Sequence, residues 1–175
     1  MKKEILFLTM ALAITSISFA QKDGKTKFSI GPEIGWATTN PLSDIPGNKG
    51  WGFGIGGSLQ IEHFFQEQLT GAVSFGIVSY AGRSSSANTK NKAYTAIPVK
   101  VGGNYYVGNK LHLGAQIGVG FNSLSGESIT TFAYTPQIGY NFSRNEKPLD
   151  LTFKYDGYAG NGGFGALGIR LSLIL

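Results

Sequence analysis

The feature that most constrains the fold is a period-two alternation of apolar residues with small or polar ones. In residues 110–121, for example, a large apolar residue or alanine occupies every second position, and Gly, Gln, His or Lys lies between. The same alternation recurs in eight segments, at residues 28–36, 51–62, 69–77, 97–105, 110–121, 132–142, 149–156 and 166–175. Because successive side chains of a strand point to opposite faces, this pattern predicts eight strands.

The connections between these segments alternate in length. Those at residues 38–50 and 82–92 are long, whereas those at 63–68 and 108–109 are tight. Short turns at one end and longer loops at the other are typical of membrane barrels with an even number of strands. We therefore predict an all-β fold, an eight-stranded antiparallel up-and-down transmembrane β-barrel with both chain ends at the end of the short turns.

Composition indicates which face of the strands meets lipid. The chain has 26 glycines, 13% aromatic and only 14% charged residues, which is unusual for a water-soluble domain. The polar set is mostly Gly, Ala, Ser and Thr, which suits a narrow lumen, while the bulky apolar set suits lipid. A soluble barrel with an apolar lumen is the alternative. No stretch of 18 apolar residues follows the N-terminus, so helical spans are excluded.

The N-terminus predicts export. Lys2 and Lys3 precede an apolar run at residues 5–14, and small residues follow at Ser18 and Ala20. This order is typical of a secretory signal peptide, and the alternative is a short membrane anchor. We expect residues 1–20 to be the signal peptide and residues 21–175 a single barrel domain. The sequence contains no cysteine, so no disulfide stabilises that domain.

The strand pattern and loop alternation resemble those of a known family, the small outer-membrane β-barrels such as the OmpA membrane domain and OmpX. The last segment is similar as well, because Gly168, Leu171 and Leu173 match the spacing of the strand that the barrel-assembly machinery reads. The resemblance implies a place in the cell outer membrane. It also implies contact with outer-membrane lipids, and with periplasmic chaperones and the assembly machinery during biogenesis.

Charged residues on the inward face are candidates for a lumen network. Counting along the strands places Glu33, Lys100, Lys154 and Arg170 near mid-height, with Asp156 above them. Barrel closure makes the last strand a neighbour of the first, so Glu33, Lys154 and Arg170 should lie close together. Since buried charges need partners, we expect an ion-pair network of these five residues that fills the lumen and fixes the register of closure.

Enzymatic chemistry has little support in the sequence. The only histidines are His63 and His112, and neither stands in a pattern that gives a nucleophile and base or a metal site. We expect no enzyme activity, no metal and no cofactor, and no nucleic-acid partner, since the charge of +5 is spread out. The aromatic residues are interpreted as girdles at the two membrane interfaces: Trp36, Trp51, Tyr80 and Tyr94 outside, and Phe64, Phe65, Tyr105, Tyr106, Tyr140 and Phe142 inside.

These observations favour an outer-membrane scaffold or surface-interaction protein with a largely plugged lumen, present as a monomer. Recognition would fall to the loops at residues 38–50 and 82–92, whose ligand the sequence does not identify. The alternative is a narrow pore for ions or small solutes. Glycines on the inner face, including Gly54, Gly56 and Gly118, leave volume that water could fill.

Overall fold

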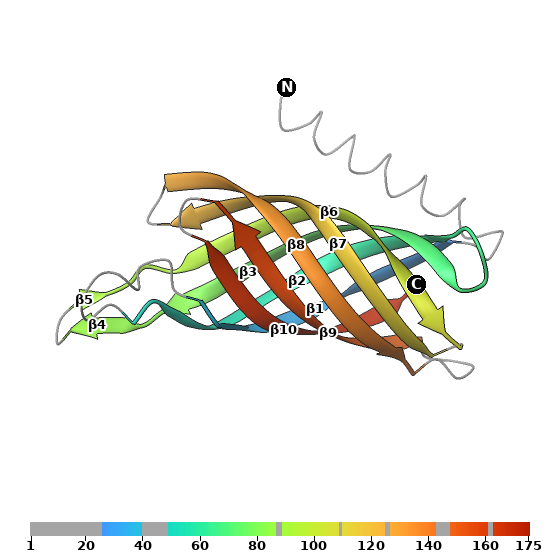
Figure 1. The fold of residues 1–175 in the computed structure, drawn as a ribbon. Helices are drawn as coiled ribbons and strands as arrows, with labels where there is room; N and C mark the ends of the chain where they lie inside the picture. Colours follow the sequence, from blue (N-terminus) through green and yellow to red (C-terminus); the bar gives the residue numbers. More distant parts are fainter. Residues whose placement is uncertain are drawn as a thin grey trace, which may run out of the picture.

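The computed structural model describes residues 26–39, 49–86, 89–108, 110–124, 127–142, 148–160 and 163–175. Within these residues, eight long strands close into one antiparallel barrel in the order β1-β10-β9-β8-β7-β6-β3-β2 (Figure 1). They are β1 (Thr26–Ala37), β2 (Trp51–Phe64), β3 (Leu69–Gly82), β6 (Tyr94–Val107), β7 (Leu111–Leu124), β8 (Glu127–Asn141), β9 (Leu149–Ala159) and β10 (Phe164–Ile174). The predicted fold class is confirmed.

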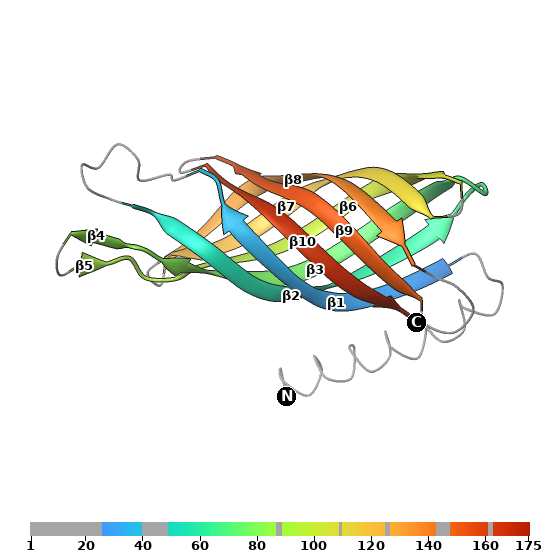
Figure 2. The same ribbon diagram turned by 90° about the horizontal axis from the view of Figure 1, so that it is seen from below.

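The two ends of the barrel differ. A short hairpin of β4 (Ser84–Ser86) and β5 (Thr89–Lys90) extends beyond the barrel at the end opposite the C-terminus (Figures 1 and 2). We call that end the outer end, and the end that holds Thr26 and Leu175 the inner end. The expected signal peptide, residues 1–20, lies outside the described residues, as does most of the 38–50 loop. Among the described residues we find no helix with the length and apolar character needed to cross a membrane.

The two faces of the barrel carry different side chains, as the alternation predicts. Bulky apolar residues point outward: Ile55 is 64% exposed and Ile117 is 54% exposed. Polar residues of the intervening positions point into the lumen, where Gln116 and Thr135 are buried. Since an exposed apolar belt around a polar interior is the pattern of a barrel in lipid, the interpretation of the apolar set as lipid-facing is confirmed.

Several strands are longer than the sequence pattern indicates. The antiparallel ladder of β7 and β8 continues to the pair Leu124 and Glu127, beyond the segment ends at residues 121 and 132 that the alternation indicates. Likewise β3 and β6 pair as far as Tyr80 and Tyr94. These extensions carry inward-facing positions toward the outer end, and there they place large aromatic rings inside the barrel.

Candidate functional site: the barrel lumen

The lumen has two regions of different chemistry. Toward the outer end, five aromatic side chains from five strands or strand ends fill it, and we call them the aromatic plug: Trp51, Tyr80, Tyr94, Tyr158 and Phe164. From mid-height to the inner end, the lumen holds hydrogen-bonded polar and charged side chains. The whole interior is the candidate site, because the buried aromatic and charged side chains of the barrel gather there.

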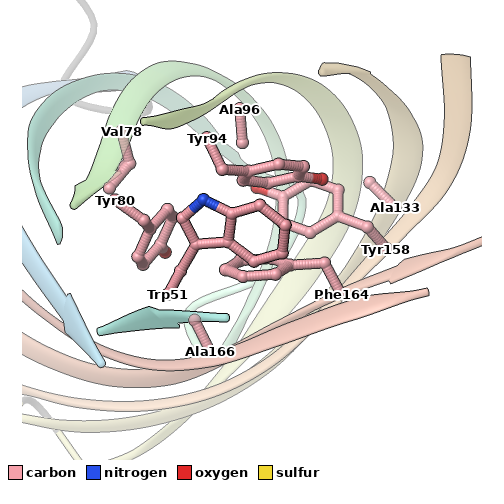
Figure 3. Close-up of a cluster of buried hydrophobic side chains, with 9 residues drawn as sticks. All are labelled: Trp51, Val78, Tyr80, Tyr94, Ala96, Ala133, Tyr158, Phe164 and Ala166. Carbon is pink, nitrogen blue, oxygen red and sulfur yellow. The ribbon is translucent and has the colours of Figure 1, made fainter. Parts of the chain in front are cut away.

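The rings of the aromatic plug contact one another at the centre of the barrel (Figure 3). The ring centroids of Tyr94 and Phe164 are 4.3 Å apart, and those of Tyr80 and Phe164 are 4.8 Å apart. Trp51 joins at 5.5 Å from Tyr94, and its indole Nε1 donates a hydrogen bond of 2.9 Å to the carbonyl oxygen of Lys92. Tilted and edge-on contacts at these distances are favourable for aromatic pairs. The rings of the plug are therefore closely packed.

Small residues on the surrounding strands leave room for these rings. Ala96, Ala133 and Ala166 lie around the plug and are almost fully buried. Tyr80 lies over two glycines: a Cβ atom on Gly54 would be 2.5 Å from its Cδ1, and one on Gly35 would be 2.8 Å from its Oη. Because no side chain fits at these distances, the ring and the glycines require each other.

The structure corrects the interpretation of four aromatics as girdle residues. Trp51, Tyr80, Tyr94 and Tyr106 lie inside the barrel, each at most 5% exposed, whereas Trp36 is 54% exposed on the outside. For Trp51 the cause is an irregularity in the β2–β3 ladder between Trp51 and Gly54, which reverses the face that it occupies. The other three continue the inward parity of β3 and β6 beyond the segments identified from the sequence.

Four of the five residues expected in the lumen network form one chain of ion pairs at mid-height. Lys154 Nζ lies 2.7 Å from Glu33 Oε2 and 3.0 Å from Asp156 Oδ2. Lys100 Nζ lies 2.8 Å from the other carboxylate oxygen, Asp156 Oδ1. The hydroxyl groups of Ser58 and Thr135 add hydrogen bonds to Glu33 and Asp156. Two carboxylates and two ammonium groups thus balance each other in the buried interior.

Arg170 lies one layer nearer the inner end. Its backbone pairs with Glu33 across the β1–β10 ladder, but its side chain points elsewhere: Nη1 donates a 2.9 Å hydrogen bond to Gln60 Oε1, and Nη2 lies 3.5 Å from Ser29 Oγ. Gln116 also donates to Gln60 Oε1, at 3.2 Å. Within the part of the chain that the structure describes, Arg170 forms no ion pair.

A third polar layer near the inner end was not anticipated from the sequence. His112 Nε2 lies 2.8 Å from Asp150 Oδ2, and Thr152 donates a 2.6 Å hydrogen bond to the second oxygen of that carboxylate. Tyr106 donates to Glu62 Oε2 at 2.8 Å, and its ring lies 5.2 Å from the imidazole. The signal that could have found this layer is the inward parity of His112 and Asp150 together with their positions at the inner starts of β7 and β9.

The remaining sequence-predicted residues lie on β10. Gly168 faces the lumen, where a Cβ atom would be 3.2 Å from Lys154 Cε, so the glycine makes room for that lysine's stem. Leu171 and Leu173 point outward, 45% and 43% exposed. The structure thus places these three residues on both faces of one strand, next to the seam between β10 and β1.

The chemistry available in the lumen is limited. The described residues contain no group of three His, Cys, Asp or Glu side chains placed to hold a metal ion. Two voids of about 10 Å³ each remain in the polar region, both lined in part by Arg170. A void of this size holds about one water molecule. Arg170 Nε, which is buried and lacks a hydrogen-bond partner among the described residues, is the kind of group that such water would satisfy.

Solved structures share this architecture. Ail, the attachment invasion locus protein of Yersinia pestis, is similar with a TM-score of 0.58 at 15% identity, over 86% of this chain and 98% of that one. OprG of Pseudomonas aeruginosa gives a TM-score of 0.54 at 10% identity, over 86% and 92%. Neisserial surface protein A gives 0.51 at 13%, over 85% and 96%. At these identities the likeness shows the fold alone. No curated protein matched in sequence.

A family model gives the assignment by sequence. The model for the outer membrane protein beta-barrel domain matches residues 7–170, nearly the whole chain. The match agrees with the closed eight-stranded barrel, its exposed apolar belt and its polar interior. The chain therefore belongs to the outer membrane protein beta-barrel domain family and is a protein of the outer membrane.

Proposed function

We propose that this barrel is an outer-membrane scaffold whose lumen is sealed and whose outer end contacts partners. The observation that carries the proposal is the aromatic plug, which brings five rings together inside one narrow cross-section. The ion-pair chain of Glu33, Lys154, Asp156 and Lys100 fills the next layer. The two voids below these layers, among the described residues, are of water size, so an ion would have to displace packed rings and paired charges to pass.

The ion-pair chain has a second role in this proposal. It joins β1, β6 and β9, which are far apart in the sequence, through side chains that meet in the lumen. A slip of one residue in any of these strands would turn its charged residue toward lipid. The network of Glu33, Lys100, Lys154 and Asp156, with Arg170 below it, thereby fixes the register in which the barrel closes.

A surface-interaction role rests on the outer end. Lys49, Arg83 and Lys92 place positive charge there, because they lie next to the outer ends of β2, β3 and β6. The β4–β5 hairpin protrudes from the same end (Figure 2). The similar fold of Ail, which is named as an attachment invasion locus protein, agrees with such a role. The partner would meet the 38–50 and 82–92 loops, parts of which lie outside the described residues.

We also propose that the chain follows the usual route of export and assembly and that its buried histidine has a structural role. The signal peptide is removed after Ala20, periplasmic chaperones carry the chain, and the assembly machinery reads β10 through Gly168, Leu171 and Leu173 before a monomeric barrel is released. His112 and Asp150 act as a structural pair, because the imidazole is 1% exposed and packs between Tyr106 and Gly139. Replacing Leu171 and Leu173 with serine should slow reconstituted assembly more than replacing Val73 and Val101.

Planar-bilayer recording of the mature protein, folded in detergent, tests the sealed lumen. We expect no steady conductance from the native barrel. A variant with Trp51→Ala, Tyr94→Ala and Phe164→Ala removes three of the five rings and should give stable channel steps. The matched control, Trp36→Ala with Phe132→Ala and Phe153→Ala, removes three outward rings, each at least half exposed, and should stay closed.

The alternative function, a narrow pore, makes the opposite prediction for the native protein. The voids on either side of Arg170 are the specific observation in its favour, because they are the beginning of a wet path. Steady channel steps from the unmodified barrel, with selectivity altered by Arg170→Met, would establish the pore and reject the sealed scaffold.

A further inference from the structure

The outer surface of the barrel contains a large groove that neither the sealed lumen nor the outer loops use. Its volume is about 790 Å³, and its lining is almost entirely apolar. The lining residues come from β2, β1, β10, β9, β8 and β7, which are consecutive neighbours in the barrel. A groove on this face of an outer-membrane barrel opens to the hydrocarbon of the bilayer.

The strand register explains the shape of the groove. Gly35, Gly168, Lys154 and Gln137 pair in one row across β1, β10, β9 and β8, with their side chains or hydrogens toward the lumen, so their backbones form the floor. The outward residues on either side of this row form two walls. One wall includes Trp36, Leu167 and Tyr155, and the other includes Ile34, Ile169 and Phe153.

The groove descends through the membrane from the outer end. It begins beside Phe53, close to the outer start of β2, and ends beside Leu113, close to the inner start of β7. Five steps of about 4.8 Å between neighbouring strands make it about 24 Å long. Strands of such barrels tilt by about 40°, so the groove drops by roughly 15 Å, about half of a hydrocarbon core. This is the depth that one leaflet's acyl chains occupy.

A cation stands at the upper end of the groove. The guanidinium carbon of Arg83 lies 5.0 Å from the ring centroid of Trp36, one of the lining residues. Gly52 leaves space for it, because a Cβ atom there would be 2.8 Å from Arg83 Nε. Within the described part of the chain no carboxylate pairs with Arg83. Stacked on an aromatic ring, the guanidinium keeps its planar donors for an anion.

The geometry points to a lipid site: we propose that the groove binds one acyl chain of a phosphate-bearing lipid whose phosphate pairs with Arg83. The apolar groove and the cation at its upper end match the two parts of such a molecule. Cations at the membrane surface attract anionic lipids, and a bidentate guanidinium suits phosphate geometry. The site lies outside the barrel, so it is independent of whether the lumen is sealed.

Tryptophan fluorescence provides the test, since the chain has two tryptophans and Trp51 is 2% exposed in the lumen. Trp36 is 54% exposed on the outside of the barrel, so its fluorescence should report on nearby acyl chains. The mature barrel is reconstituted in vesicles that contain lipids with brominated chains, either phosphatidylglycerol or phosphatidylcholine, diluted with unbrominated phosphatidylcholine. From the quenching of Trp36, we expect the phosphatidylglycerol to bind about fivefold more strongly at this position.

Matched variants assign the preference to the site. Arg83→Gln should reduce the ratio to about one, while Lys92→Gln, which removes an exposed charge at the same end, should leave it unchanged. Ile34→Phe narrows the groove and should lower the ratio, whereas Val73→Phe, on the lipid-facing side of β3, should not. Folding of each variant is checked by the gel shift between unheated and boiled samples.

Three results would overturn the lipid site. The first is equal quenching by both brominated lipids in the native protein. The second is a preference that survives Arg83→Gln, which would assign it to general surface charge. The third is weak quenching by both lipids together with a cross-linked dimer through this face, which would show that a second copy of the chain covers the groove.

Discussion

The outer and middle regions of the lumen are filled with side chains of opposite chemistry. In both regions, side chains must fill a narrow lumen without leaving large cavities. The outer region uses aromatic rings against alanine and glycine, whereas mid-height uses four charges that neutralise one another. Loss of a ring leaves an apolar cavity, but loss of a charge leaves its partner buried without compensation. We therefore expect that stability lost with a charge is recovered by replacing its partner as well, whereas stability lost with a ring is recovered by restoring its volume.

The largest effect should come from Asp156→Ala. This carboxylate pairs with both Lys100 and Lys154, so its removal leaves Lys100 with Thr135 as its one remaining side-chain partner among the described residues. We expect the free energy of unfolding to fall by about 5 kcal/mol, at the upper end for a broken buried pair. Urea unfolding in lipid vesicles measures it. The double variant Lys100→Met with Asp156→Leu should recover most of the loss, and an equal loss in both would show that charge compensation does not set the stability here.

Phe164→Ala tests the plug. The ring contacts four others and is 2% exposed, so we expect a loss of about 3 to 4 kcal/mol. Phe164→Leu, which keeps most of the volume, should cost about 1 kcal/mol. The outward Phe153→Ala, in contact with lipid, is the control and should cost less than Phe164→Ala. If Phe153→Ala is equally costly, the plug is not a special packing unit.

Variants of Arg170 test whether its guanidinium forms a hydrogen bond to the neutral Gln60 or an ion pair with Glu33. Because its guanidinium donates to Gln60, we expect Arg170→Met to lower the free energy of unfolding by about 1.5 to 3 kcal/mol. Double-mutant cycles that combine Glu33→Gln with a replacement of Lys154 or of Arg170 measure the two coupling energies. The coupling of Glu33 to Lys154 should exceed about 1 kcal/mol, and its coupling to Arg170 should stay below about 0.5 kcal/mol. The reverse order would place Arg170 within the ion-pair chain.

The smallest effect concerns the inner layer. His112→Gln removes the imidazole that meets Asp150, and we expect a loss of about 1 kcal/mol. His63→Gln is the matched control, because His63 lies on the exposed side and bonds only Thr26 among the described residues. Chemical unfolding of both variants should separate them. A larger loss for His63 would contradict a structural role of the buried pair.

Alternation along the chain was enough to predict the strands, the closure and the lipid-facing set. It also gave the inward parity of Glu33, Lys100, Lys154 and Asp156, which the structure brings into one chain of ion pairs. Parity and depth suffice for such residues because an eight-stranded lumen is so narrow that inward groups at one height meet.

Alternation along the chain does not predict ladder irregularities, the exact ends of strands or the conformation of long side chains. The irregularity between Trp51 and Gly54 breaks the period of two, so Trp51 turned inward against the pattern. Tyr80 and Tyr94 kept the pattern but lay past the ends assigned to their strands. The partner of Arg170 depends on the conformation of a long side chain, which reaches past its ladder neighbour to Gln60.

The fit of large side chains over glycines limits which substitutions this sequence can accept during evolution. Tyr80 needs Gly35 and Gly54, and His112 needs Gly139, where a Cβ atom would be 2.2 Å from its Nε2. We therefore expect a glycine and the ring that covers it to vary together, because a side chain at the glycine needs a smaller residue in place of the ring. Homologous barrels should show correlated changes at these pairs, and a designer who transplants the plug must move the glycines with the rings.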